Sequence, residues 1–324
     1  MGKAPAVHDR ERERADLRRH SGLSVGGRGR LRLAGKRRLW GIQNDSAGNL
    51  INVEDIGGAV KTGSTAAKKP NSFVYRYLPA HPGDLHNGKL QVLQVLNSAK
   101  GLQTTPAQPA AKQGTPFKRP ENGQFRPGSD FTQFFFDETG DTDATSSENG
   151  NPDTGVGGTG GWGAIFKLKQ SPTSDAGKLS LFYKGNIHVS GLDNASFLSK
   201  TKITFVEDAG DTLHTQRNAL DSGYVFDVKS DYSDVSNQPL RWLAEGRDAS
   251  ATIDSSFSFS KNEGDNEITG TNVSNGDPTT DGILGAEIPH LFKGGWRWFY
   301  TQQHGDNPTY EVVPSSSKHG GSDD

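Results

Sequence analysis

From Trp40 onward the chain alternates between short apolar segments and clusters of turn residues. The segment NSFVYRYLP places large and polar residues at a period of two, which is typical of a half-buried strand, and PGDLHNG breaks this pattern before the next apolar segment, KLQVLQVL. Four later segments continue the series, and they are AIFKLKQ, KLSLFYKG, KTKITFVED and SGYVFDVKS. Because the body has no three-turn amphipathic segment with a period of about 3.6 residues, the pattern predicts an all-β protein.

The spacing of these strands indicates the architecture. About four strands recur in each stretch of roughly 45 residues without helices between them, as a propeller blade requires, although a β-sandwich would use similar strands. We predict a β-propeller over residues 40–313, incomplete or with few blades, and with long polar loops. The polar, proline-rich stretch Asn97–Gly123 is expected to be one exposed loop, and DATSSENGNPDTGVGGTGGWG another.

The composition agrees with an assembly of short strands. Of 324 residues, 41 are glycine and 16 are proline, and only 31% are hydrophobic, so a core must be built from many short segments. The chain has no cysteine, which excludes disulfide bonds, thiolate metal ligands and a cysteine nucleophile. No run of about 18 apolar residues is present and no hydrophobic region follows Met1, so the sequence predicts neither a membrane span nor a secretory leader.

Charge is distributed unevenly along the chain. Residues 1–39 hold 12 Lys and Arg against 4 Asp and Glu, a net charge of +8, whereas the remainder holds 24 against 34, a net charge of −10. Because the first 39 residues also lack aromatic residues, we predict a disordered basic tail there, and a second disordered tail at residues 314–324. The basic tail could serve nucleic-acid binding or targeting, but a solvated tail is the simpler interpretation, and the acidic body argues against a nucleic-acid partner. We expect a monomer.

Acidic residues follow several of the predicted strands. In a propeller the inner strands line the central channel, so acids at equivalent strand ends converge. A ring of carboxylates could supply the roughly six to eight oxygen ligands that Ca²⁺ takes. The candidate metal ligands are Glu54, Asp55, Asp193, Glu207, Asp208 and Glu267. Each acid taken alone is also typical of a solvated turn, and only the repeated position after an apolar strand favours a shared site.

Two further residues are candidates for catalysis. His304, in QQHGD, follows the aromatic strand WRWFYTQ, and Arg126, in FRPGSD, could clamp an anion with its guanidinium. A structural hydrogen bond for the histidine and a surface ion pair for the arginine are the alternatives. The sequence contains no HExxH motif, GxSxG elbow, Walker loop or GxGxxG after a strand, so it predicts neither those hydrolase sites nor a nucleotide loop.

Six segments in a fixed order point to a known family. They are NSFVYRYLPAHPGDLHNGKLQVL, FRPGSD, GAIFKL, GLDNASF, NEITGTNVSNGD and WFYTQQHGDN. In this order the chain resembles the PhoX-type alkaline phosphatases over roughly Trp40 to Asn307. The resemblance implies a β-propeller phosphomonoesterase that uses Ca²⁺ and iron, with a phosphate monoester or other small anion as ligand. It further implies that Arg126 matches the phosphate-contacting arginine of an Arg-Pro-Glu motif, and that Glu267 and His304 lie in late-blade motifs.

The chain departs from this family pattern at three points. Gly128 stands where the motif has its glutamate, the family's bridging cysteine is missing, and the pattern begins late in the chain. The resemblance gives a metal-dependent phosphatase as the first hypothesis. Because of the departures, the alternative is a non-catalytic calcium-binding propeller scaffold that lacks the iron centre. A basic-tailed nucleic-acid binder is the third hypothesis.

Overall fold

The computed structural model describes residues 39–43, 73–80, 86–97, 101–103, 114–115, 117–129, 132–140, 162–171, 175–209, 213–214, 217–244, 267–279, 287–303 and 308–314. Every named element within these residues is a β-strand, which confirms the all-β prediction. Apart from Leu39 and Pro314, the two predicted tails lie outside the described residues, and so does the proposed nucleic-acid role of the basic tail. In the described part of the chain, no helix is both long enough and apolar enough to cross a membrane.

The strands form five small sheets. Their bounds are β1 (Leu39–Gln43), β2 (Phe73–Pro79), β3 (Gly88–Val92), β4 (Val95–Asn97), β5 (Gly101–Gln103), β6 (Gly123–Phe125), β7 (Gln133–Glu138), β8 (Ala164–Gln170), β9 (Gly177–Lys184), β10 (Leu192–Phe197), β11 (Lys202–Glu207), β12 (Ser222–Asp227), β13 (Leu240–Ala244), β14 (Glu267–Ser274), β15 (Arg297–Gln303) and β16 (Thr309–Val312). Within each sheet the strands follow chain order, and every pair of neighbours is antiparallel.

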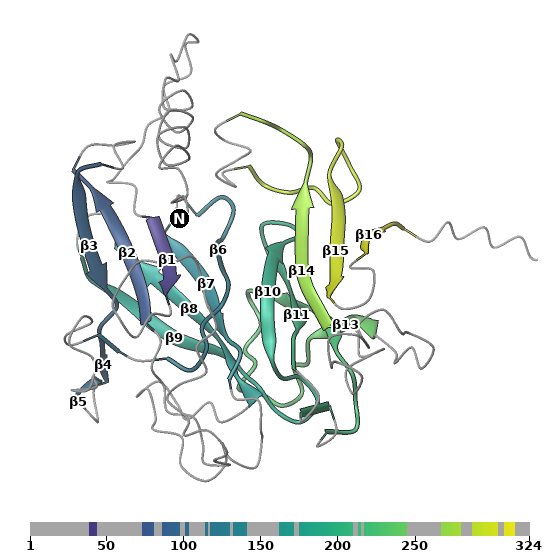
Figure 1. Cartoon of the computed structure of the whole chain (residues 1–324), viewed down its shortest axis with the longest axis horizontal. Helices are drawn as coiled ribbons and strands as arrows, with labels where there is room; N and C mark the ends of the chain where they lie inside the picture. Colours follow the sequence, from purple (N-terminus) through teal and green to yellow (C-terminus); the bar gives the residue numbers. More distant parts are fainter. Residues whose placement is uncertain are drawn as a thin grey trace, which may run out of the picture.

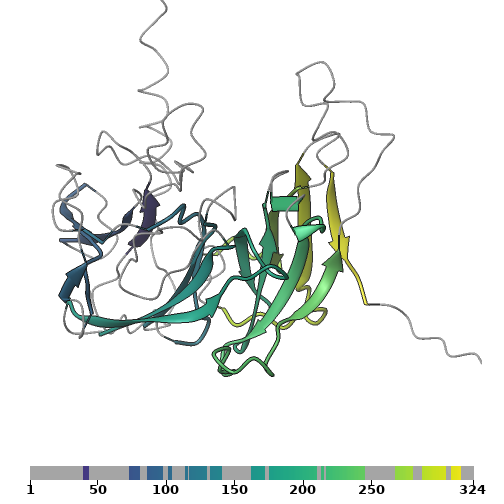
Figure 2. The same ribbon diagram turned by 90° about the horizontal axis from the view of Figure 1, so that it is seen from below.

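The four larger sheets also follow one another in space in chain order. Figures 1 and 2 show the sheet β6–β9 between the sheet β1–β3 on one side and the sheet β10–β13 on the other, with β14–β16 beyond. Strand β10 lies against β6 and β7, and β14 lies against β10 and β11. Hydrogen bonds between side chains and backbone join these sheets: the Phe197 amide donates to Gln124 Oε1 over 2.7 Å, and the Val273 amide donates to Ser196 Oγ over 3.1 Å.

Strand β7 lies between two hydrophobic cores. Its side chains alternate between faces, so Phe135 packs into the core that it shares with β10, β11 and β12, while Phe134 and Phe136 pack into the core on the other side. Phe136 is fully buried and meets Phe117 edge to face, with ring centroids 5.4 Å apart. Because β7 is buried on both faces, its sequence QFFFDE lacks the polar alternation of a surface strand.

This packing leads to a stability prediction. Replacing Phe136 with Ala removes a fully buried ring and leaves a cavity beside Phe117 and Phe166, so we expect a loss of about 3–5 kcal/mol in the free energy of unfolding. The matched control is Leu96→Ala, because Leu96 is 76% exposed and its truncation should change stability by no more than about 0.5 kcal/mol. Urea unfolding measures both values, and equal losses would contradict the assigned packing.

The stretch Asn97–Gly123 departs from its predicted exposure. Its described part includes Thr115, Phe117, Lys118 and Arg119, none of which is more than 6% exposed. The segment runs beside β7: the Thr139 amide donates to the Arg119 carbonyl over 2.8 Å, and the Lys118 amide donates to the Glu138 carboxylate. The prediction of an exposed loop was therefore wrong for these residues, because pairing with β7 satisfies their backbone groups inside the protein.

Candidate metal centre

Three carboxylates from two sheets converge beside the contact of β10 with β6 and β7. Glu121 lies two residues before β6, Asp193 is the second residue of β10, and Asp208 directly follows β11. One carboxylate oxygen of each lies within 4.8 Å of the others. Asp193 is only 5% exposed, and the other two residues are partly buried. The arrangement therefore concentrates negative charge in a region with little solvent.

Two backbone features place Asp193 and Asp208 in this cluster. The register of β10 on β11 shifts between Leu192 and Ala195, so β10 carries an extra residue opposite the end of β11. Such a bulge redirects side chains and is common next to functional sites. Just before it, Gly191 adopts a φ of +60°, and a Cβ there would lie 2.8 Å from the Ala209 Cα. Glycine thus permits the close approach in which the Asp208 amide donates to the Gly191 carbonyl over 2.8 Å.

Asp137 holds the third ligand in position. This fully buried residue of β7 accepts hydrogen bonds at Oδ1 from the amides of Glu121, over 3.1 Å, and Asn122, over 2.8 Å. Its other oxygen, Oδ2, is buried and has no hydrogen-bond partner among the described residues. A buried carboxylate oxygen without a partner is costly, so its presence beside three further carboxylates is a feature that a bound cation would explain.

The carboxyl groups perturb one another. Burial, followed by the negative charges of Glu121, Asp137 and Asp208, raises the pKa of Asp193 well above its usual value of 3.8. Burial also raises the pKa of Asp137, and the neighbouring Glu121 adds to this effect, while the amides of Asn122 and Glu121 oppose it. Like charges held this close favour uptake of a proton or of a cation.

Amide and guanidinium groups surround the carboxylates. The Asn122 side chain donates to Asn194 Oδ1 over 3.1 Å, and Asn194 Nδ2 donates to Asp193 Oδ2 over 2.8 Å. Arg119 is 6% exposed, and its Nη2 lies 3.4 Å from Glu121 Oε1. Oxygen donors from carboxylates and amides suit a hard cation such as Ca²⁺, and the cluster offers no sulfur because the chain has no cysteine. The residues present therefore fit calcium.

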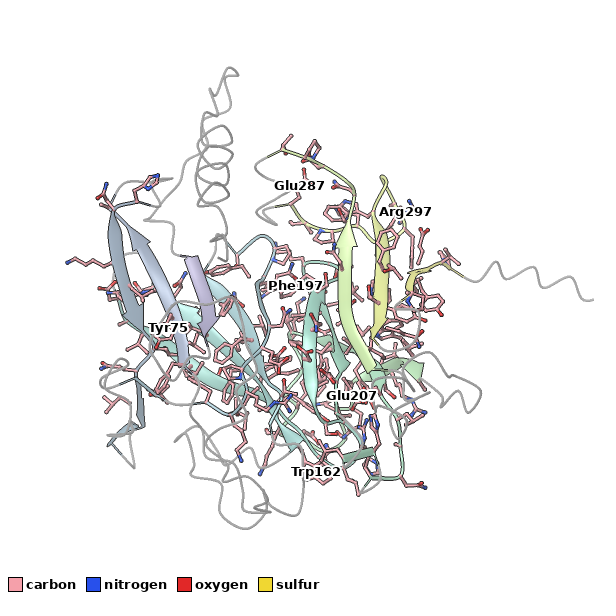
Figure 3. All side chains as sticks on the ribbon, viewed as in Figure 1. Tyr75, Trp162, Phe197, Glu207, Glu287 and Arg297 are labelled. Atoms are coloured by element: carbon pink, nitrogen blue, oxygen red, sulfur yellow. The ribbon has the colours of Figure 1, made fainter. Side chains whose placement is uncertain are left out.

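The structure brings together two of the six predicted metal ligands, Asp193 and Asp208. Glu207, labelled in Figure 3, is fully buried in a different network. Both of its carboxylate oxygens accept hydrogen bonds from Arg217, over 2.8 and 3.0 Å. Glu267 begins β14, and its side chain is not described. Glu54 and Asp55 lie outside the described residues. Their roles, and that of Glu207, stay predictions.

The two predicted catalytic residues are not in the cluster as described. His304 lies outside the described residues. Arg126 donates through Nε to the Lys200 carbonyl over 2.8 Å and through Nη1 to Gln133 Oε1 over 3.2 Å, so its guanidinium contributes to the contact of β6 with the β10–β11 turn. Its role in binding phosphate also stays a prediction.

Sequence analysis missed Glu121 and the adjacent Arg119. The signal was the run Arg119-Pro120-Glu121-Asn122, which contains the Arg-Pro-Glu order that the resemblance assigned to Arg126 and that Gly128 interrupts there. The run lies seven residues earlier, inside the stretch that we expected to be an exposed loop. With the motif placed at Arg119, the missing glutamate is Glu121, one of the three converging carboxylates.

The pKa of Asp193 has a consequence for stability. In the unfolded chain this carboxyl ionises near its usual value, whereas the folded protein keeps it protonated to higher pH, so the folded state binds more protons and loses stability as pH rises through this interval. Asp193→Asn removes the effect. Urea unfolding in EDTA from pH 4 to pH 8 measures the free energy of unfolding of both proteins. We expect Asp193→Asn to become more stable relative to the parent as the pH rises. The exposed Asp231→Asn provides the control, and a constant difference for Asp193→Asn would contradict the prediction.

The fold and the cluster define a class: an all-β protein of successive antiparallel sheets with a carboxylate cluster between two of them. No family model and no curated protein match the chain. Among solved structures, PhoX of Pseudomonas fluorescens in complex with vanadate, a transition-state analogue, matches with a TM-score of 0.44 and 14% sequence identity, over 74% of this chain and 45% of that one. The chain spans less than half the length of that protein.

Proposed function

We propose that this chain is a metal-dependent phosphomonoester hydrolase of the PhoX type, with Ca²⁺ held by Glu121, Asp193 and Asp208. The observation that carries the proposal is the convergence of these carboxylates within 4.8 Å beside the unpartnered, buried Oδ2 of Asp137. Four acids gathered in one largely buried region favour uptake of a cation in addition to the charge that Arg119 supplies. The resemblance of the motif order to that of PhoX-type alkaline phosphatases adds the reaction class, which is phosphomonoester hydrolysis.

The chain's own residues have separable roles in this proposal. Asp137 accepts hydrogen bonds from the backbone amides of Glu121 and Asn122 and so positions one ligand. Arg119 holds a buried guanidinium next to Glu121, where its positive charge could bind and orient a phosphoryl group. Bound calcium would supply a positive charge that stabilises developing negative charge on phosphate oxygens.

We further propose that the sheets are blades of an incomplete β-propeller. Three of the sheets, β6–β9, β10–β13 and β14–β16, are antiparallel meanders in chain order, and consecutive sheets contact one another. In a propeller, the inner strands and the loops next to them meet near the axis. Such a meeting point would bring carboxylates from different sheets together, as in this cluster.

A calcium-binding scaffold without catalysis is the second candidate. The absence of cysteine from the whole sequence supports it, since the resemblance implies an iron centre bridged by a cysteine. All the donors of the cluster are oxygen, which favours calcium over iron. Both candidates share the calcium site and differ only in turnover.

One experiment separates the two candidates. Purified protein is analysed for bound metals and assayed for phosphate release from p-nitrophenyl phosphate with calcium, and again after chelation. We expect bound calcium and turnover that chelation abolishes. Calcium without turnover would select the scaffold, and absence of calcium binding would overturn both.

A pair of arginine variants tests which Arg-Pro motif binds phosphate. Arg119→Gln is expected to reduce kcat/KM by about 100-fold or more, because it removes a charged donor that would bind the phosphoryl group. Arg126→Gln is the matched control and should retain activity within a few-fold, since Arg126 binds Lys200 and Gln133. Calcium-dependent melting of both variants checks that the site is intact. A large loss confined to Arg126→Gln would reassign the motif.

A further inference from the structure

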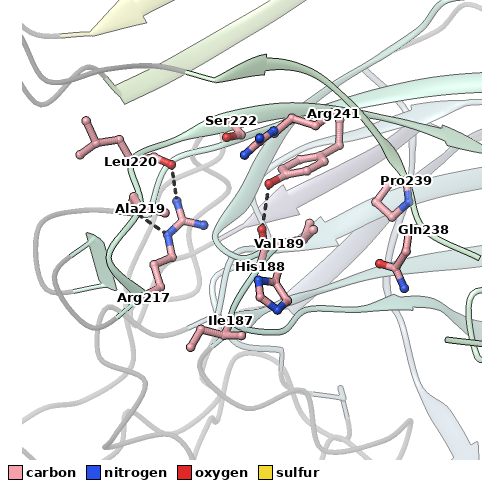
Figure 4. A pocket seen from close by; sticks show the side chains of 11 residues that line it. Ile187, His188, Val189, Arg217, Ala219, Leu220, Ser222, Gln238, Pro239 and Arg241 are labelled. Atoms are coloured by element: carbon pink, nitrogen blue, oxygen red, sulfur yellow. Dashed lines mark hydrogen bonds between the residues drawn. The ribbon is translucent and has the colours of Figure 1, made fainter. Parts of the chain in front are cut away.

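A cavity of about 270 Å³ lies beside β12 and β13, and none of its lining residues belongs to the carboxylate cluster. Three segments form its walls: the turn between β9 and β10 with Ile187 and His188, the segment before β12 with Arg217 and Leu220, and the start of β13 with Arg241. Figure 4 shows Arg241 and Ser222 on one side of the pocket and Ile187 and His188 on the opposite side. Its volume is near the lower limit of small-molecule sites, which begin at roughly 300 Å³.

A β-bulge places Arg241 at this pocket. The register of β12 on β13 shifts between Gly223 and Tyr224: Gly223 pairs with Leu243 and Tyr224 with Arg241, which leaves Trp242 as the extra residue. Directly paired residues lie on the same face of a sheet, so Arg241 shares the face of Tyr224, and both line the pocket. A Cβ at Gly223 would lie 2.5 Å from the Trp242 ring, so only glycine leaves room for this arrangement.

Hydrogen bonds between residues of the turn and of β12 fix the polar walls of the cavity. The Tyr224 hydroxyl donates to the His188 carbonyl over 2.8 Å, and the His188 amide donates to Asn186 Oδ1 over 2.8 Å. These bonds hold the β9–β10 turn against β12. Preformed walls of this kind reduce the ordering cost of binding a ligand.

The two arginines of the pocket differ in charge balance. Arg217 is buried and forms ion pairs with Glu207 and Asp221, which do not line the cavity. These carboxylates offset the charge of Arg217. Arg241 is exposed and has no assigned ion pair or hydrogen bond among the described residues, and no Asp or Glu lines the cavity. Among the described residues, the pocket thus presents one guanidinium without a paired carboxylate, next to apolar groups from Ile187, Leu220 and Pro239.

We propose that this pocket binds a small organic monoanion, a carboxylate with a compact apolar body. A guanidinium recognises a carboxylate through two parallel hydrogen bonds, and the apolar walls would cover the rest of the molecule. A phosphate dianion fits less well, because Glu207 and Asp221 lie directly behind Arg217 and repel a second negative charge. The inference does not depend on calcium or on phosphatase activity.

The test is a titration of the full chain in EDTA, so that the metal centre cannot contribute. Benzoate and butanoate are the probes, benzamide is the neutral analogue of benzoate, and inorganic phosphate is the dianion control, all followed by calorimetry. We expect the carboxylates to bind and both benzamide and phosphate to bind at least about tenfold more weakly. Arg241→Gln should weaken carboxylate binding by about 10- to 100-fold.

The matched control is Lys293→Gln, which removes an exposed cation that does not line the pocket and should leave binding unchanged. Circular dichroism verifies the fold of each variant. The proposal is overturned if neither carboxylate binds at roughly 10 mM, if benzamide binds as tightly as benzoate, if phosphate binds as tightly as the carboxylates, or if Arg241→Gln binds as the parent does.

Discussion

Replacing Asp208 with Asn is expected to abolish the stabilisation by calcium that the proposed metal centre predicts. The substitution removes one of three carboxylates that lie within 4.8 Å of one another and leaves an amide with a single neutral oxygen donor. A ligand at one hundred times its Kd stabilises the folded state by about 2.7 kcal/mol, so the parent should melt several degrees higher in excess calcium. The melting temperature with calcium and with EDTA measures the effect.

The metal-free variant provides an internal check. Because Asp208 raises the pKa of Asp193 by charge repulsion, Asp208→Asn relieves that repulsion and should leave the protein in EDTA at least as stable as the parent. A variant that merely misfolds would melt lower under both conditions. Asp231→Asn, at an exposed acid in a turn with Ser233, is the control and should keep the full calcium shift. Full retention of the shift in Asp208→Asn would remove Asp208 from the metal centre.

Replacing Arg217 with Leu is expected to cost about 3–5 kcal/mol of stability at pH 8. The Arg217 guanidinium is buried and binds both oxygens of Glu207, as well as Asp221 over 3.2 Å and the Ser190 hydroxyl over 3.0 Å. Its removal leaves two buried carboxylates without their cation. Urea unfolding at pH 8 measures the loss.

The loss should be smaller at pH 5. Burial already raises the pKa of Glu207 to about 7 in the presence of Arg217, and without the cation the pKa rises further. A carboxyl with a raised pKa in the folded state binds a proton that the unfolded state lacks, so the variant regains stability as pH falls below that pKa. Arg297→Leu is the control, because Arg297 pairs with Glu311 on the surface and its loss should have little effect at either pH. Equal losses at pH 5 and pH 8 would contradict the buried pairing.

Local patterns predicted the strands well and the metal centre only in part. The segments AIFKLKQ and KLSLFYKG correspond to β8 and β9, because side-chain alternation and turn residues are local signals. In FVED, however, Glu207 and Asp208 are equally acidic neighbours, and the alternation of a strand sends consecutive side chains to opposite sides. Glu207 forms an ion pair with Arg217, whereas Asp208 lies in the carboxylate cluster with Asp193. Only these contacts in the folded protein distinguish the two residues.

Glu121 was missed for a related reason. It lies in a proline-rich, polar segment whose composition is typical of an exposed loop. Its position comes from Asp137, sixteen residues later in β7, which binds the Glu121 amide. A contact between segments separated in this way leaves no periodic signal in either segment, so composition alone could not place Glu121 in the site.

The donors of the metal centre come from both sides of the junction between β9 and β10. No fragment that ends at β9 or begins at β10 contains the complete ligand set. The shortest piece of chain that contains the whole proposed site therefore runs from Glu121 through Asp208. Gene fusions, circular permutations or splits that separate these two residues without reassembly would yield proteins that keep individual sheets but lose the proposed metal site.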